Sequence, residues 1–161
     1  MIKTEQMQIR VSPEEKARIR EAAARAGVDM SEWVLSRLFT AEGEEFRSLI
    51  VELGTSTRIS LPLAVLNDLL DELTAERFEV AVAVEPIGLT PYLANYVAAM
   101  VEHAAYLKGV SPPEWVATIG PLDEPVFGTD LKSLRLHLLT QSPPAFRRRN
   151  IFIDATVGDR V

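Results

Sequence analysis

QMQIRVSPEE, residues 6–15, is the stretch that decides the fold predicted for this chain. From Gln6 to Val11 polar and apolar residues alternate strictly, which is typical of a strand with one buried face. Ser12 then fits the N-cap of a helix, Pro13 fits its first position, and Glu15 completes a capping box. The stretch therefore predicts a short strand that leads directly into a helix.

Two short helices are expected after this strand. The first ends at Gly27, a residue typical of the position just past a helix end. The second begins near Asp29 or Ser31, either of which suits its N-cap, and it has a broad apolar face. Each helix has only about three turns, which is too short for stability alone in water. The first 42 residues must therefore bury their apolar faces against something else.

A second copy of the chain is the expected partner of the strand, because no other strand pattern lies nearby. If two strands pair antiparallel, their outward side chains form a ribbon that fits the DNA major groove, where Gln can bind adenine and Arg can bind guanine. The alternative is a strand in an ordinary sheet of the same chain, with solvated Gln and Arg. The side chains expected to read bases are Gln6, Gln8 and Arg10. Those expected in the dimer core are Met7, Ile9, Val11 and Trp33.

These residues resemble the ribbon–helix–helix DNA-binding proteins, which include the Arc and methionine repressors and many bacterial antitoxins. The resemblance covers about a quarter of the chain. It implies an intermolecular β-ribbon, and it implies that the backbone amides of Met30 and Ser31 hold a DNA phosphate at the start of the second helix. The positions that carry it are Gln6–Val11, Ser12-Pro13, Gly27 and Met30-Ser31-Glu32.

The remainder of the chain is expected to be mostly helical. Apolar spacing predicts helices near 62–77, 90–110 and 130–139. The alternating valines of 78–84 favour a strand or extended segment, and the alternative, from its alanines and the neighbouring helix, is a continued helix. The fold class expected is mainly α, with a ribbon–helix–helix unit at 1–42 and a mostly helical domain at 43–161. Charge supports this division, since residues 1–42 sum to zero while residues 43–146 hold six Lys and Arg against fourteen Asp and Glu.

Three consecutive arginines near the C-terminus are candidates for binding a partner: Arg147, Arg148 and Arg149. The alternative is a solvated turn of helix between Phe146 and Phe152. The stretches WVATIGPLDEPVF and PPAFRRRNIFI resemble antitoxin-type proteins encoded beside nucleotidyltransferase-like toxins. That resemblance implies a toxin-binding C-terminal domain, whose acidity would suit a basic toxin.

Several kinds of site are excluded by composition. The chain has no cysteine, which excludes disulfides and thiolate metal sites and favours a cytoplasmic location. Its two histidines, His103 and His137, have no second His or Cys at metal-ligand spacing. Phosphate loops, nucleophile elbows, secretion signals and apolar runs of ~20 residues are also lacking. We therefore expect no catalysis, no metal, no cofactor and no membrane contact.

The function predicted is that of a homodimeric antitoxin of a type II toxin–antitoxin module. It would repress its own operon by binding operator DNA and would neutralise a cognate toxin by direct contact. The alternatives are a ribbon–helix–helix transcriptional repressor without a toxin, or a plasmid partition or mobilisation accessory protein. The net charge of −6 argues against a general nucleic-acid coat protein.

Overall fold

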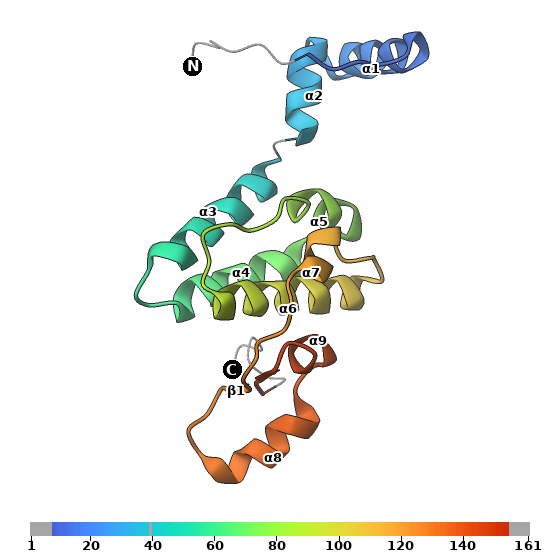
Figure 1. The fold of residues 1–161 in the computed structure, drawn as a ribbon. Helices are drawn as coiled ribbons and strands as arrows, with labels where there is room; N and C mark the ends of the chain where they lie inside the picture. The colour runs from blue at the N-terminus through green and yellow to red at the C-terminus, as the bar shows by residue number, and fades with distance from the viewer. Residues whose placement is uncertain (1–7, 39, 155–161) are drawn as a thin grey trace. The chain divides into compact units, whose positions relative to one another are not determined.

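Residues 8–38 and 40–154 are described by the structure, a computed structural model (Figure 1). The chain divides into an N-terminal unit, Met1–Thr40, and a C-terminal unit, Ala41–Val161. The boundary that charge predicts, between 42 and 43, falls in the first turn of helix α3 (Ala41–Thr55).

The N-terminal unit contains helices α1 (Pro13–Ala26) and α2 (Met30–Leu38), which pack against each other. The start of α1 is a capping box: Ser12 Oγ accepts from the Glu15 amide at 3.2 Å, and the Ser12 amide donates to Glu15 Oε2 at 2.7 Å. Gly27 ends the helix with φ 71°, a left-handed conformation that favours glycine. The predicted start and stop of the first helix are thereby confirmed.

The predicted β-ribbon is wrong. Residues 8–11 lie in no strand, while Gln6 and Met7 lie outside the described residues. The strands of the described chain are β1 (Val126–Phe127) and β2 (Ile151–Phe152), which pair with each other in parallel, far from the N-terminus in sequence. Alternation specifies the faces of a strand but supplies no partner for its backbone. Ile9 and Val11 accordingly remain 57% and 41% exposed.

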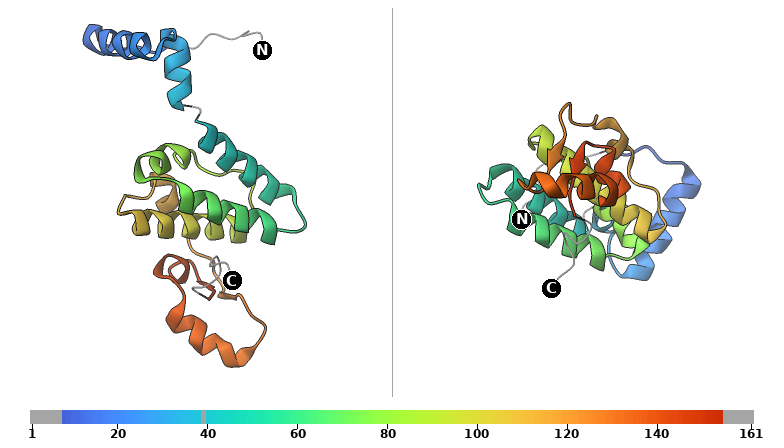
Figure 2. Two further views of the ribbon diagram at one scale, coloured as in Figure 1. Left: turned by 180° about the vertical axis from the view of Figure 1, so that it is seen from behind. Right: turned by 90° about the horizontal axis from the view of Figure 1, so that it is seen from below.

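The C-terminal unit is built around one long helix, α6 (Pro91–Lys108), which is buried without interruption from Asn95 to Val101. A helix that is buried on every side belongs in the interior, and α6 contacts α4, α5, α7 and α9 (Figures 1 and 2). The other helices of this unit, besides α3, are α4 (Ser60–Glu72), α5 (Ala75–Ala81), α7 (Glu114–Thr118), α8 (Lys132–Gln141) and α9 (Pro144–Arg147).

Two expectations about the middle of the chain are wrong. The single helix expected at 62–77 is two helices, because the chain becomes extended at Leu73 and Thr74 before α5 begins. The segment 78–84, expected to be extended, lies in α5 and the turn after it. Phe78, Ala81 and Val82 are all buried, at the spacing of one helix face, so packing against the core decides in favour of a helix over an extended segment.

Two side-chain hydrogen bonds connect the later elements of the C-terminal unit to the segments they pack against. The Trp115 indole Nε1 donates to the Val82 carbonyl at 2.8 Å, which ties α7 to the end of α5. After α8, the Ser142 hydroxyl lies 2.6 Å from the Ile153 carbonyl, so the end of α8 is fastened beside β2. Among the described residues, no helix has both the length and the apolarity needed to cross a bilayer.

Candidate nucleic-acid interface

The residues expected to read DNA bases precede α1. Gln8 and Arg10 are exposed and lie in a stretch without regular secondary structure, and Gln6 lies outside the described residues. The capping box positions this stretch, because it fixes the backbone at Ser12 to which the stretch is joined. Both side chains therefore face solvent at the entry to the first helix.

Exposed cations continue along α1. Lys16, Arg18 and Arg20 are all exposed, and Arg25 forms an ion pair with Glu21 at 3.3 Å. Six Lys and Arg stand against five Asp and Glu over residues 8–40, whereas residues 41–154 hold nine against sixteen. The N-terminal unit is thus the part of the described chain that repels a phosphate backbone least.

The start of α2 is capped by Asp29. Its carboxylate accepts from the Glu32 amide at 2.8 Å, and its carbonyl accepts from the Trp33 amide at 2.9 Å. Asp29, and not Ser31, is therefore the N-cap, which settles the two alternatives that the sequence allows. The amides of Met30 and Ser31 were expected to hold a DNA phosphate. A phosphate bound there would lie beside the carboxylate of Asp29, and the two negative charges would repel each other.

The predicted dimer-core residues are poorly covered within one chain. Ile9 and Val11 are exposed, Trp33 is half-buried, and Met7 lies outside the described residues. The guanidinium carbon of Arg37 lies 5.4 Å from the centre of the Trp33 ring, a cation–π contact at one side of α2. Ala23 is the one buried hydrophobic residue that the described part of this unit contains. The unit has very little core of its own.

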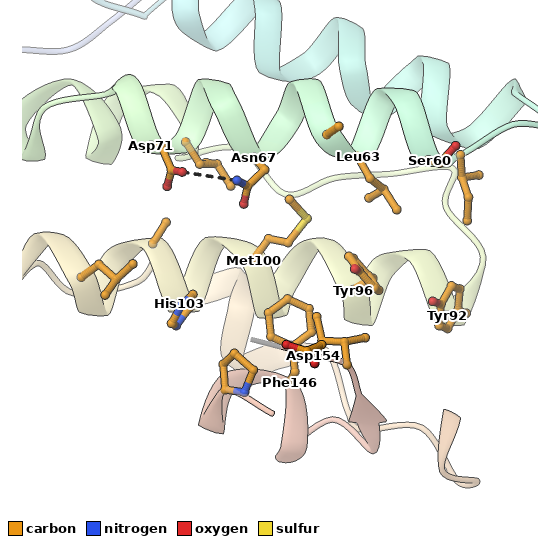
Figure 3. A pocket seen from close by; sticks show the side chains of 17 residues that line it. Ser60, Leu63, Asn67, Asp71, Tyr92, Tyr96, Met100, His103, Phe146 and Asp154 are labelled. Carbon is orange, nitrogen blue, oxygen red and sulfur yellow. Dashed lines mark hydrogen bonds between the residues drawn. The ribbon is translucent and has the colours of Figure 1, made fainter. Parts of the chain in front are cut away.

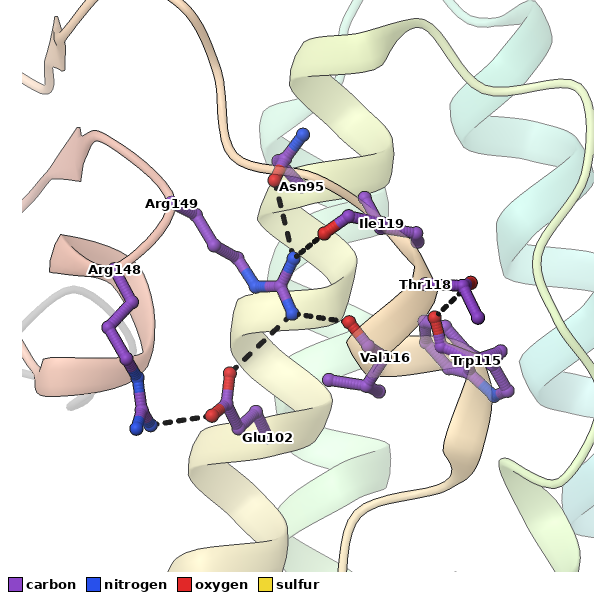
Figure 4. A network of polar contacts seen from close by, with 8 residues as sticks. All are labelled: Asn95, Glu102, Trp115, Val116, Thr118, Ile119, Arg148 and Arg149. Atoms are coloured by element: carbon purple, nitrogen blue, oxygen red, sulfur yellow. Dashed lines mark hydrogen bonds and ion pairs between the residues drawn. The ribbon is translucent and has the colours of Figure 1, made fainter.

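The three C-terminal arginines have different surroundings (Figure 4). Arg147 is exposed, and Arg148 forms an exposed ion pair with Glu102. Arg149 is only 6% exposed, so it is an internal residue and is not open to a partner. Sequence reasoning missed this role, because a run of arginines by itself indicates a charged surface.

Arg149 joins three parts of the C-terminal unit. Its burial lowers the pKa of its guanidinium, and the neighbouring carboxylate of Glu102, 3.6 Å away, acts in the opposite direction. Its Nε has no hydrogen-bond partner within the described chain. Its other nitrogens donate to Val116 O at 2.7 Å, Ile119 O at 3.0 Å and Asn95 Oδ1 at 3.3 Å.

A groove of about 400 Å³ lies along α4 and α6, with Phe146 of α9 and the residues just after β2, Ile153 and Asp154, forming its third side (Figure 3). Tyr96 packs edge-on against Phe146, with ring centres 5.3 Å apart, and burial raises its pKa to about 12. Burial also raises the pKa of Tyr92, whose ring lies 5.8 Å from that of Tyr96. Both tyrosines are therefore neutral, packed walls of the groove over the ordinary pH range.

Within residues 8–38 and 40–154, no three His, Asp or Glu side chains come together in a way that could hold a metal ion.

Comparison with known proteins gives one result. Residues 1–56 match the family model described as NikA-like, mobilization protein NikA. The match spans the N-terminal unit and all of α3, about a third of the chain. No curated protein and no solved structure matches the chain. The predicted antitoxin role and its cognate toxin gain no support from these comparisons, which favour the mobilisation alternative.

Proposed function

We propose that this chain is an accessory protein of DNA mobilisation that binds duplex DNA through its N-terminal unit. The observation that carries the proposal is the match of residues 1–56 to a family described as a mobilization protein. This match favours the mobilisation alternative over the antitoxin role, which no observation supports.

The chemistry of the N-terminal unit supports a DNA contact. Gln8 and Arg10 are exposed, and such side chains can bond to adenine and guanine in the major groove. The cations Lys16, Arg18 and Arg20 continue this exposed surface along α1 and are suited to phosphate contacts. We assign base contacts to Gln8 and Arg10, together with Gln6, and phosphate contacts to the helix cations.

Self-association is part of the proposal, because the N-terminal unit needs cover for its apolar side chains. Chains of about 40 residues rarely fold alone without a metal, a disulfide or a partner. Ile9, Val11 and the half-buried Trp33 are the side chains that a second copy would cover. The unit would then bind DNA as a symmetric pair, without catalysing a reaction.

The test is DNA binding by the full chain, measured by fluorescence anisotropy with duplexes tiled across the mobile DNA that encodes it. Arg10→Ala should weaken binding to the preferred duplex about 5- to 150-fold, which corresponds to the loss of ~1–3 kcal/mol. Arg58→Ala, an exposed arginine of the C-terminal unit, is the matched control and should leave affinity unchanged. Affinity should also fall steeply as salt concentration rises.

Two outcomes would contradict the proposal. Equal losses for the two variants would mean that residues other than the N-terminal arm carry the contact. If deletion of the gene leaves transfer of its DNA unchanged but raises transcription from its own promoter, the chain is a plain repressor.

A further inference from the structure

The groove of the C-terminal unit has a defined chemistry. Its walls are mainly apolar, with Leu63, Met100 and Leu107 among them, and the carboxylates that line it are those of Asp71 and Asp154. Among the residues that the structure describes, no lysine or arginine lines it. Figure 3 shows the labelled side chains on α4 and α6 with Asp154 on the third side. An occupant should therefore be apolar along its length and carry positive charge.

Helix α8 has these properties and is itself poorly covered. Leu138 is its one buried residue. Lys132, Leu136 and Leu139 follow a spacing of four and three, which places them on one side of the helix. Leu136 is 73% exposed and Leu139 is 42% exposed. This side of α8 is an apolar stripe with a cation at its first turn, the form in which helices dock into grooves.

Charge separates the two surfaces along the chain. Residues 41–131, which include α4 and α6, hold fifteen Asp and Glu against four Lys and Arg. Residues 132–149, which include α8 and α9, hold five Lys and Arg and no Asp or Glu. Helix α8 itself, with Lys132 and Arg135 and no acidic residue, is therefore complementary in charge to the carboxylates of the groove, Asp71 and Asp154.

The groove and helix α8 are neighbours on the same molecule. Ile153 and Asp154 line the groove, and they also line a second hollow of about 310 Å³ beside Leu134 and Leu138 of α8. Within one chain α8 is held beside β2 by Leu138 and by the Ser142 hydroxyl, so its outward stripe does not enter its own groove.

We propose that the groove is a docking site for α8 of a second copy of this chain. The contact is reciprocal, with Leu136 and Leu139 of each copy against the apolar walls of the other groove and Lys132 towards its carboxylates. Such a self-complementary contact closes as a dimer. It lies entirely in the C-terminal unit and does not depend on the proposed DNA binding.

The test uses cross-linking of the full chain, which contains no native cysteine. Leu136→Cys and Leu107→Cys are made in separate chains and mixed with a short bifunctional maleimide. A product of two 17.9 kDa chains can then form only between copies. We expect this product from the mixture, and a yield several-fold lower from Leu136→Cys alone.

Leu61→Cys is the matched control for Leu107→Cys. Leu61 is 69% exposed and lies on α4 without lining the groove, whereas Leu107 is 65% exposed and lines it. Pairing Leu136→Cys with Leu61→Cys should give little product. Adding Asp71→Lys to the Leu107→Cys chain should lower the yield, because it places a cation where Lys132 approaches.

Equal yields from the two pairings would overturn the proposal, and so would the absence of product from both. The experiment contains no DNA, so a failure to bind DNA leaves its result intact. A positive cross-link would likewise say nothing in favour of the mobilisation role.

Discussion

Arg149 connects parts of the C-terminal unit that are distant in sequence. Its guanidinium reaches the carbonyls of Val116 and Ile119 at the end of α7 and the side chain of Asn95 on α6. Buried carbonyls are costly when they lose their donor, and the half-buried carboxylate of Glu102 also loses a cation. The cluster of arginines thus contains one internal residue beside two exposed ones.

We predict that Arg149→Ala lowers the free energy of unfolding by about 3–5 kcal/mol, because it leaves these acceptors and Glu102 without their buried partner. Arg148→Ala removes only an exposed ion pair to the same Glu102 and should cost at most about 1 kcal/mol. Urea unfolding of the full chain, followed by circular dichroism, measures both. Similar losses for the two variants would show that Arg149 has no special structural role.

Glu15 provides a prediction on pH. The pKa of its carboxyl lies below the ordinary value of 4.5. The main cause is the hydrogen bond from the Ser12 backbone amide, and the hydrogen bond with the Ser12 side chain is the second. Because the folded pKa is the lower one, the stabilisation is complete above the unfolded pKa and disappears as pH falls through the folded pKa. An NMR titration of the Glu15 carboxyl carbon should have its midpoint below 4.5.

Ser12→Ala should raise that midpoint towards the ordinary value, because it removes one of the two contacts. Glu15→Gln should remove the part of the stability of α1 that depends on pH. The amide side chain of Gln can also complete a capping box, but it does not titrate. A midpoint unchanged by Ser12→Ala would mean that the box does not control this carboxyl.

At the scale of the element, the turn between α1 and α2 depends on Gly27. Its φ of 71° is strained for any residue with a Cβ, although no atom lies within 4 Å of where that Cβ would be. Gly27→Ala should therefore destabilise the α1–α2 pair by about 1–2 kcal/mol through the backbone alone. Faster amide hydrogen exchange at Ala23–Val28 would report the loss.

Gly120→Ala is the control for this prediction. Gly120 also has open space around its Cβ position, but its φ lies outside the left-handed region. The substitution should leave hydrogen exchange in α7 and the following loop unchanged or slower. Equal effects at the two glycines would remove the backbone explanation.

At the scale of the whole molecule, the two units differ in how much core they contain. The C-terminal unit holds a continuous cluster of buried side chains from Phe46 to Ile153, whereas Ala23 is the one buried hydrophobic residue in the described part of the N-terminal unit. Hydrophobic burial is the main favourable term in folding, so the two units should differ in independent stability.

We predict that a fragment of residues 41–161 unfolds cooperatively on heating. A fragment of residues 1–40 should be largely unstructured when dilute and should gain helix as its concentration rises, because a second copy supplies the missing cover. Circular dichroism over a range of concentrations measures both. A sharp, concentration-independent transition in the short fragment would contradict this view.

Local signals were the part of this fold that could be predicted from the sequence. The capping box of Ser12 and Glu15, the stop at Gly27, and the helix between Thr90 and Gly109 all agree with prediction. Each depends on contacts between residues at most four or five positions apart, and such contacts form wherever the chain lies. The exposure of Gln8 and Arg10 was likewise expected, although their role stays a prediction.

Only the tertiary structure decided the features that depend on distant residues. The alternation of Gln6–Val11 could not reveal whether its backbone finds a partner, and residues 8–11 have none in a strand. The valines of 78–84 joined a helix because Phe78 and Val82 meet the core. Arg149 is internal because it donates to acceptors inside the fold. These acceptors lie 30 or more residues away in sequence, so no local pattern could reveal the contact.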